Sequence, residues 1–118
     1  MSDTGLIVFL GCADIDATHA FYAGALGLAL DRDQGLCRIY RVPGGGRLGF
    51  CTHVPVVRGE RSPIVTLVVD DVEAWHARLV AAGVACEHPP RENPRFRIQH
   101  FFVRDPDGHC VEVQRFLD

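Results

Sequence analysis

The sequence predicts an α+β fold built from two tandem βαβββ units, and two internal matches support this prediction. An apolar run at residues 7–10 and the helical pattern behind it recur at residues 64–67, at an offset of 57. Residues 43–49 match residues 106–112 at an offset of 63. A unit of roughly 60 residues is marginal as an independent fold. We therefore expect a single domain over residues 1–118, with pseudo-repeats at residues 5–54 and 62–117.

Each unit should begin with a strand that leads into a helix. Near-continuous apolar runs at residues 6–12 and 63–69 are typical of strands buried on at least one face. Asp14 is a good N-cap for the first helix, and Gly27 stands where a glycine ends a helix. The second helix repeats this design, with Asp70 or Asp71 as the cap and Gly83 at the end.

Three strands should follow each helix, and the last two should form a hairpin. The hairpin turns contain Pro43-Gly44-Gly45-Gly46 in the first unit and Asp105-Pro106-Asp107-Gly108 in the second. The acidic residues of the second turn could also bind a metal, but the turn role fits them better. The expected ranges are 28–32, 35–42 and 47–53 in the first unit and 84–88, 96–104 and 109–116 in the second, with a loop at 89–94.

Composition excludes several classes of function. All twelve basic residues are arginine, so no lysine can form a Schiff base or bind a phosphate in a P-loop. The net charge of -3 does not favour nucleic acid or an anionic membrane as a partner. No apolar run approaches the roughly 20 residues that span a bilayer. We expect a cytoplasmic protein whose partner is a small molecule.

The cysteines are expected to be reduced and mostly buried. There are five of them, an odd number, and they are widely spaced without a C-x-x-C pair. Free cysteine commonly behaves as a small hydrophobic residue. The five are Cys12, Cys37, Cys51, Cys86 and Cys110.

The repeated framework carries two motifs that indicate a family. Phe21-Tyr22 before Leu26-Gly27, and residues 102–112 around the Asp-Pro-Asp-Gly turn, resemble the vicinal oxygen chelate superfamily over nearly the whole chain. That superfamily includes glyoxalase I, extradiol dioxygenases, fosfomycin-modifying transferases and bleomycin-binding resistance proteins. The resemblance implies two curved mixed sheets, each with a helix on its outer face, whose concave faces enclose a pocket, often within a homodimer.

The resemblance also implies four positions for metal ligands, on the first and last strand of each unit. Carried over to this chain, they fall on Ile7, Gly49, Ile64 and Glu112. Only Glu112 can bind a cation, whereas a tightly bound transition metal needs three or four protein ligands. We therefore expect no metal cofactor, although an unorthodox divalent metal site that includes Glu112 and His100 remains an alternative.

Strand alternation places a set of side chains on the expected concave face. Glu112 is the main candidate, either as a base that abstracts a proton or as an anchor for a ligand. His100 should share its face and either bind a ligand or pair with Glu112. Arg91, Arg95 and Arg97 flank the proline-rich loop and are either solvated or hold an anion. The expected substrate-binding residues are Ile7, Phe9, Ile64, Thr66, Phe102 and Gln114.

These observations favour a metal-independent protein of the glyoxalase/bleomycin-resistance type that binds an apolar or aromatic small molecule. Whether it is an enzyme stays open. The first alternative is a lyase, isomerase or dioxygenase with the unorthodox metal site. The second is a structural or regulatory dimer whose pocket is filled by its own side chains.

Overall fold

The computed structural model describes residues 4–118 and divides the chain into two compact units, Met1–Val57 and Arg58–Asp118. The division falls between the two pseudo-repeats that the sequence predicts. Each unit contains a four-stranded mixed sheet and a helical segment, as the expected βαβββ order requires. In the described residues, no helix is long and apolar enough to cross a membrane.

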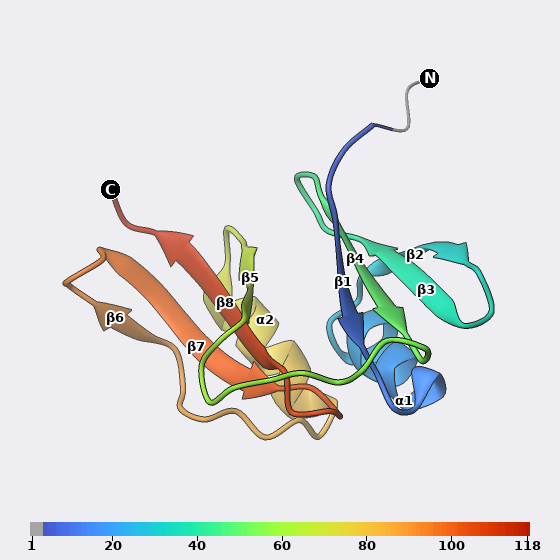
Figure 1. The fold of residues 1–118 in the computed structure, drawn as a ribbon. Coiled ribbons are helices and arrows are strands. Elements are labelled where there is room, and N and C mark those ends of the chain that lie inside the picture. The colour runs from blue at the N-terminus through green and yellow to red at the C-terminus, as the bar shows by residue number, and fades with distance from the viewer. Residues whose placement is uncertain (1–3) are drawn as a thin grey trace. The chain divides into compact units, whose positions relative to one another are not determined.

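The first unit is a sheet in the order β1-β4-β3-β2, drawn in blue to green in Figure 1. β1 runs parallel to β4, and the other neighbours are antiparallel. The helix α1 continues directly into a π-helical turn, η1, before β2. The bounds are β1 (Ile7–Gly11), α1 (Ile15–His19), η1 (Ala20–Ala25), β2 (Ala29–Asp33), β3 (Cys37–Arg41) and β4 (Arg47–Cys51).

The helical segment of this unit begins and ends where its sequence indicates. The carboxylate of Asp14 accepts hydrogen bonds from the backbone N–H groups of the first turn and so caps it. Gly27 has a φ of 74°, which a glycine adopts without strain. Tyr22 is fully buried and stacks on Phe50 of β4 with ring centroids 4.2 Å apart. Nδ1 of His19 lies 2.9 Å from the hydroxyl of Tyr40, so His19 packs on the helix side of the sheet.

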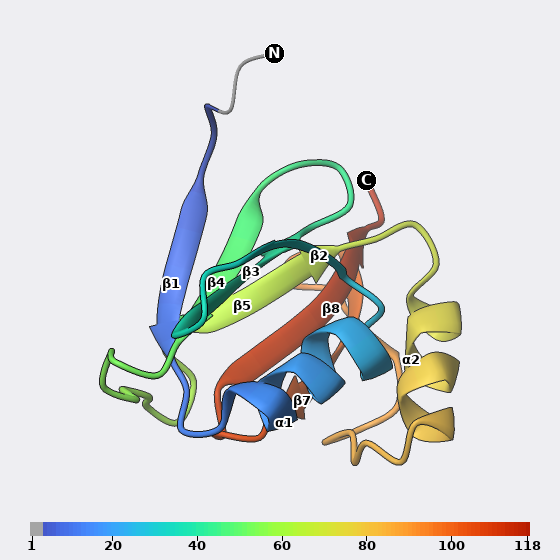
Figure 2. The same ribbon diagram turned by 90° about the vertical axis from the view of Figure 1, so that its right-hand side faces the viewer.

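The second unit repeats this topology in the order β5-β8-β7-β6. β5 is parallel to β8, and the remaining pairs are antiparallel. Figure 2 shows α2 lying along one face of this sheet. The bounds are β5 (Ile64–Val68), α2 (Val72–Ala81), β6 (Arg91–Asn93), β7 (Ile98–Arg104) and β8 (Cys110–Phe116).

The helix α2 packs on the sheet through one apolar stripe. Asp71, rather than Asp70, is the N-cap, because its carboxylate accepts the backbone N–H of the first turn. Val72 and Leu79 are 1% and 0% exposed. His76 contacts the ring of Phe101 edge-on, with centroids 5.2 Å apart, and thus lies on the helix side of the sheet.

The prediction of a strand at residues 84–88 is wrong for most of these residues. Only one bridge forms there, between Cys86 and Val103, and the ladder resumes at β6 within the segment that was expected to be a loop. Pro89 and Pro90 lie between the two pairings. Because proline has no N–H to donate, the pair interrupts the strand. Residues 84–93 therefore replace one continuous strand with two short pairings.

The turn between β7 and β8 has the structural role that the sequence predicts. One carboxylate oxygen of Asp105 accepts the backbone N–H groups of Asp107 and His109, at 3.0 and 2.8 Å. Gly108 has a φ of 85°, the conformation that favours glycine. Asp105 thus stabilises a tight turn by bonding its own backbone, as such residues commonly do.

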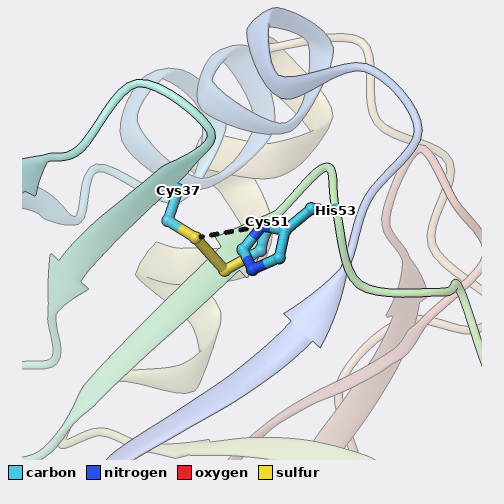
Figure 3. A group of neighbouring side chains, drawn as sticks. All are labelled: Cys37, Cys51 and His53. Carbon is cyan, nitrogen blue, oxygen red and sulfur yellow. Dashed lines mark hydrogen bonds between the residues drawn. A yellow bond between two sulfur atoms is a disulfide. The ribbon is translucent and has the colours of Figure 1, made fainter.

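The prediction that all cysteines are reduced is wrong for two of them. Cys37 on β3 and Cys51 on β4 form a disulfide (Figure 3). They are directly opposite in the antiparallel ladder, with Cα atoms 4.2 Å apart, which is close enough for a disulfide. The other three cysteines, Cys12, Cys86 and Cys110, are not part of a disulfide.

Candidate functional site

The face of the second sheet that is turned away from α2 carries the predicted polar residues. Side chains alternate along each strand, so Val111 and Val113, both fully buried, face α2, and Glu112 faces the other way. The strand register places Thr66 of β5 and Phe102 of β7 directly beside Glu112. The prediction that these side chains share a face is thereby consistent with the pairing of the strands.

Glu112 lies at the centre of a hydrogen-bond network in which it and His100 are buried. It is 8% exposed, and His100 is 7% exposed. The hydroxyl of Thr66 donates to Oε1 of Glu112 at 2.9 Å, and Nδ1 of His100 lies 2.6 Å from Oε2. An ionised carboxylate can only accept, so His100 donates through Nδ1 to the ionised form of Glu112. The structure thus brings together both residues that the sequence singled out.

Gln114 completes this network from the same strand. With its amide nitrogen turned toward the carboxyl group, it donates to both oxygens of Glu112 at 3.3 Å. A carboxylate offers about four lone-pair positions in total. Donors from Thr66, His100 and Gln114 therefore occupy most of the accepting capacity of Glu112, and each donor holds the carboxyl group in one orientation.

A cavity of about 740 Å³ lies over this network within the second unit. That volume falls in the usual range for sites that bind drug-sized molecules. Half of its twelve lining residues are apolar, three of them phenylalanine, and the other half are polar or charged. The lining residues are Ile64, Arg91, Glu92, Asn93, Pro94, Phe96, Ile98, His100, Phe102, Glu112, Gln114 and Phe116.

Several lining residues were not among the expected substrate-binding residues. Phe96 and Phe116 are 61% and 56% exposed and contribute aromatic rings. Extending the alternation of β7 and β8 by one step beyond Ile98 and Gln114 would have identified both. Arg91 and its neighbours in β6 line the cavity only because the ladder resumes after the two prolines. The sequence singled out Arg91 as a possible anion ligand but offered no comparable signal for Glu92 and Asn93.

Two expected substrate-binding residues, Ile7 and Phe9, are on β1 of the first unit, and their part in a ligand site stays a prediction. Thr66 contacts Glu112 but is not among the lining residues. Ile64, Phe102 and Gln114 do line the cavity.

An ion pair holds an arginine against the aromatic wall. The guanidinium of Arg61 lies 4.1 Å from the centroid of Phe102 and binds Glu87 with two hydrogen bonds of 2.9 and 2.7 Å. The hydrogen bond from Arg61, with further attraction from Arg61 and Arg104, lowers the pKa of Glu87 below its ordinary value. The same hydrogen bond raises the pKa of Arg61. Glu87 thereby fixes the cation over the ring.

The four positions that the family resemblance implies do not fit a divalent metal. They hold Ile7, Gly49, Ile64 and Glu112, so they provide one carboxylate where three or four ligands are needed. The oxygens of Glu112 also accept hydrogen bonds from Thr66 and His100. The side chains at these positions therefore do not support chemistry through a bound divalent metal.

Two other groups of metal-binding side chains occur in the described residues. One is Asp105, Asp107 and His109 in the turn before β8, where Asp105 already bonds the backbone of the turn. The other is Cys37, Cys51 and His53 in the first unit. The protein thus contains potential metal ligands, but away from the positions that the resemblance implies.

Comparison with known proteins is consistent with the sequence and the fold. The model of the Glyoxalase/Bleomycin resistance protein/Dioxygenase superfamily matches residues 6–113. No curated protein matches the chain.

Solved structures share the fold over nearly all of the chain. A glyoxalase/bleomycin resistance protein/dioxygenase from Alicyclobacillus acidocaldarius is 15% identical and has a TM-score of 0.81, covering 98% of this chain and 93% of its own. A glyoxalase/bleomycin resistance protein from Albidiferax ferrireducens is 26% identical, with a TM-score of 0.72 and coverage of 93% and 97%. A lactoylglutathione lyase from Agrobacterium tumefaciens is 22% identical, with a TM-score of 0.73 and coverage of 97% and 94%.

Proposed function

Because the chain belongs to the glyoxalase/bleomycin resistance protein/dioxygenase superfamily, we propose that it binds an apolar or aromatic small molecule in the cavity of its second unit, without a metal at the positions that the family resemblance implies. The observation that carries this proposal is the buried pair of Glu112 and His100 beneath a cavity of about 740 Å³ that three phenylalanine rings help to line. An open volume of this size favours a ligand over a core filled by the protein itself.

The lining residues indicate what the ligand should look like. Phe96, Phe102 and Phe116 offer ring faces and edges to an aromatic body. The long contacts from Gln114 are the ones that a ligand can displace from Glu112, so the matching group on the ligand is a hydrogen-bond donor or a cation. An aromatic compound that carries an amine or hydroxyl group therefore fits this cavity better than an anionic one.

Calorimetric titration with a panel of neutral, cationic and anionic aromatic compounds tests this function. We expect a basic aromatic compound to bind the wild-type protein, and Glu112→Gln to weaken it by about tenfold to hundredfold, the range for a lost bond to a charged group. Glu73→Gln, on α2 at the opposite face, is the matched control and should leave affinity unchanged. Binding that is equal in wild type and Glu112→Gln would contradict the proposed anchor.

Metal-dependent catalysis is the alternative, and the closeness of Glu112 and His100 is the observation in its favour. Both side chains are common ligands of transition metals. Elemental analysis of protein purified without chelators separates the two functions. One metal ion per chain that is lost in Glu112→Ala would support the enzyme, with a lyase, isomerase or dioxygenase as the reaction classes, and would overturn the metal-free proposal.

A homodimer is the assembly that we propose. β1 and β5 are edge strands of their own sheets, and apolar side chains on them are exposed, among them Phe9 at 47% and Val68 at 51%. Exposed apolar edges favour pairing with another chain. Light scattering should give about twice the chain mass of 13.0 kDa, whereas the mass of one chain would contradict the dimer.

A further inference from the structure

The first unit contains three ligand-type side chains that the proposed function does not use. Cys37 on β3 and Cys51 at the end of β4 are 8% and 3% exposed and form the disulfide. His53 follows two residues after Cys51, and its Nδ1 lies 3.9 Å from Sγ of Cys37 (Figure 3). The two sulfur atoms and a ring nitrogen of His53 all lie within 4.8 Å of one another.

Backbone pairing holds the ladder between β3 and β4 along its whole length. Five residue pairs join the two strands, from Cys37 opposite Cys51 to Arg41 opposite Arg47. The corresponding ladder between β7 and β8 has the same register at His100 and Gln114 and contains no cysteine there. The disulfide can therefore open while the strands stay paired, and its sulfur atoms would stay near His53.

The spacing of these atoms suits a soft metal ion. Zinc binds thiolate sulfur at about 2.3 Å and imidazole nitrogen at about 2.0–2.1 Å, so the two donor atoms of a tetrahedral site lie about 3.6 Å apart. The observed 3.9 Å between Cys37 and His53 is close to this value. The sulfur atoms must separate from a bond of about 2.05 Å before both can bind one ion. Metal binding and the disulfide thus exclude each other.

We propose that Cys37, Cys51 and His53 form a redox-controlled site for a soft divalent cation such as Zn²⁺ or Cd²⁺. A dithiol reductant gives two electrons and two protons to the disulfide and is itself oxidised to a disulfide. The metal ion then displaces the two thiol protons, is bound by both thiolates and the imidazole, and keeps one position open. A small-molecule disulfide oxidant takes two electrons back, reforms the Cys37–Cys51 bond and releases the ion.

This site is separate from the positions that the family resemblance implies, since none of its members is residue 7, 49, 64 or 112. His53 is exposed, so the ion can exchange with solvent without passing through the protein. Two thiolates favour soft or borderline ions over Mg²⁺ and Ca²⁺, which take oxygen ligands.

Titration of the full chain with Cd²⁺ after reduction by a phosphine, which is then removed, tests the proposal. We expect one ion per chain, release of two protons, and ultraviolet thiolate-to-cadmium absorption that falls by half in Cys37→Ser and in Cys51→Ser. His53→Gln should weaken binding by more than the roughly 10- to 100-fold that loss of an outer-shell partner costs. The oxidised chain should show no such absorption, and Mg²⁺ should not compete.

Cys86→Ser is the matched control, because Cys86 is a free cysteine of the second unit. This substitution should leave the absorption unchanged. Burial raises the pKa of the Cys86 thiol, so it forms a thiolate less readily than an ordinary cysteine. Equal Cd²⁺ affinity in reduced wild type and Cys37→Ser would overturn the proposal. A disulfide that resists reduction until the chain unfolds would overturn it as well, without any variant.

Discussion

In the second unit Thr66 is paired with Glu112, and at the same step of the ladder in the first unit Phe9 is paired with Gly49. In the first unit, the ring of Phe9 lies over Gly49, and a side chain at position 49 would overlap that ring. The ring thus occupies the place where the second unit has a carboxyl group and its hydroxyl donor.

The two units also differ at a facing pair of residues on the neighbouring antiparallel ladder. His100 is opposite Gln114 in the second unit, and Cys37 is opposite Cys51 in the first. One pair therefore contributes donors to a buried acid, whereas the other forms a covalent bond. Backbone pairing fixes which residues meet, but the side chains alone decide the chemistry. The comparison shows that one repeated framework carries two different sites.

Reduction of the disulfide should produce the largest change in stability. A loop of about 15 residues closed by a disulfide contributes about 3 kcal/mol in the chain-entropy model, and here the cysteines are 14 residues apart. Urea unfolding of wild type with and without a phosphine, in the presence of a chelator, measures this loss. Cys37→Ser should show no response to the phosphine, and a full response in that variant would break the assignment.

The second-largest change in stability should come from substituting His100 or Cys37, which occupy equivalent positions in the β7–β8 and β3–β4 ladders. His100→Ala removes the shorter of the two hydrogen bonds to Oε2 of Glu112 and should cost about 2 kcal/mol, as for a lost bond to a charged group. Cys37→Ala, compared with reduced wild type, should cost only about 1 kcal/mol, the typical value for a single substitution. Urea unfolding under reducing conditions compares them.

The double variant His100→Ala/Glu112→Gln serves as the control for this pair. A neutral amide in place of the acid removes the uncompensated charge, so the double variant should be more stable than the sum of the single losses implies. Strict additivity would mean that the bond between His100 and Glu112 contributes nothing.

Gly49→Ala tests how tightly the ring of Phe9 covers the first ladder. The added methyl group forces the ring aside, and overpacking of this kind costs about 1 kcal/mol at its lower end, because Phe9 is 47% exposed and free to move outward. Phe9→Thr copies Thr66 of the second unit. In that background, Gly49→Ala should be nearly neutral. An equal cost in both backgrounds, measured by thermal unfolding, would contradict the proposed overlap.

The smallest effect concerns an acid that follows the helix in each unit. Asp31 binds Arg41 at 2.8 Å in the first unit, and Glu87 binds Arg61 at 2.7 Å in the second. The folded-state pKa of Glu87 is lowered by its hydrogen bond to Arg61, so the pair stabilises the protein above the ordinary pKa near 4.5, and this contribution is lost as pH falls through the lowered value. Partial exposure keeps it below about 1 kcal/mol.

Glu87→Gln should therefore be slightly less stable than wild type at neutral pH and equally stable at acidic pH. Urea midpoints from pH 7 downward measure the difference. A gap that widens on acidification would reverse the sign and contradict the ion pair.

Much of the fold was accessible from the sequence because it depends on local patterns. The two repeat offsets, the caps Asp14 and Asp71, and the glycines that end the helices each follow from short-range spacing. Alternation along β7 and β8 also predicted that His100 and Glu112 share a face, and the hydrogen bond between them is consistent with it.

Other features depended on where each ladder begins and stops. The disulfide follows from the register of β3 and β4, which the hairpin sequence already contained. Residues 41 and 47 flank the turn of this hairpin, and counting four residues outward on each strand leads to Cys37 and Cys51. The split strand before β7 depended on how far two prolines displace the pairing. Small errors in strand boundaries are enough to hide both.

The sequence by itself determined the repeated βαβββ framework, its family and the single acid among the four implied ligand positions. Only the tertiary structure decided that this acid is held by three donors, that Phe9 covers Gly49, and that a cavity opens over the second sheet. The physical reason is that periodicity fixes the direction of a side chain, whereas burial, partners and open volume depend on residues that meet only after the strands have paired.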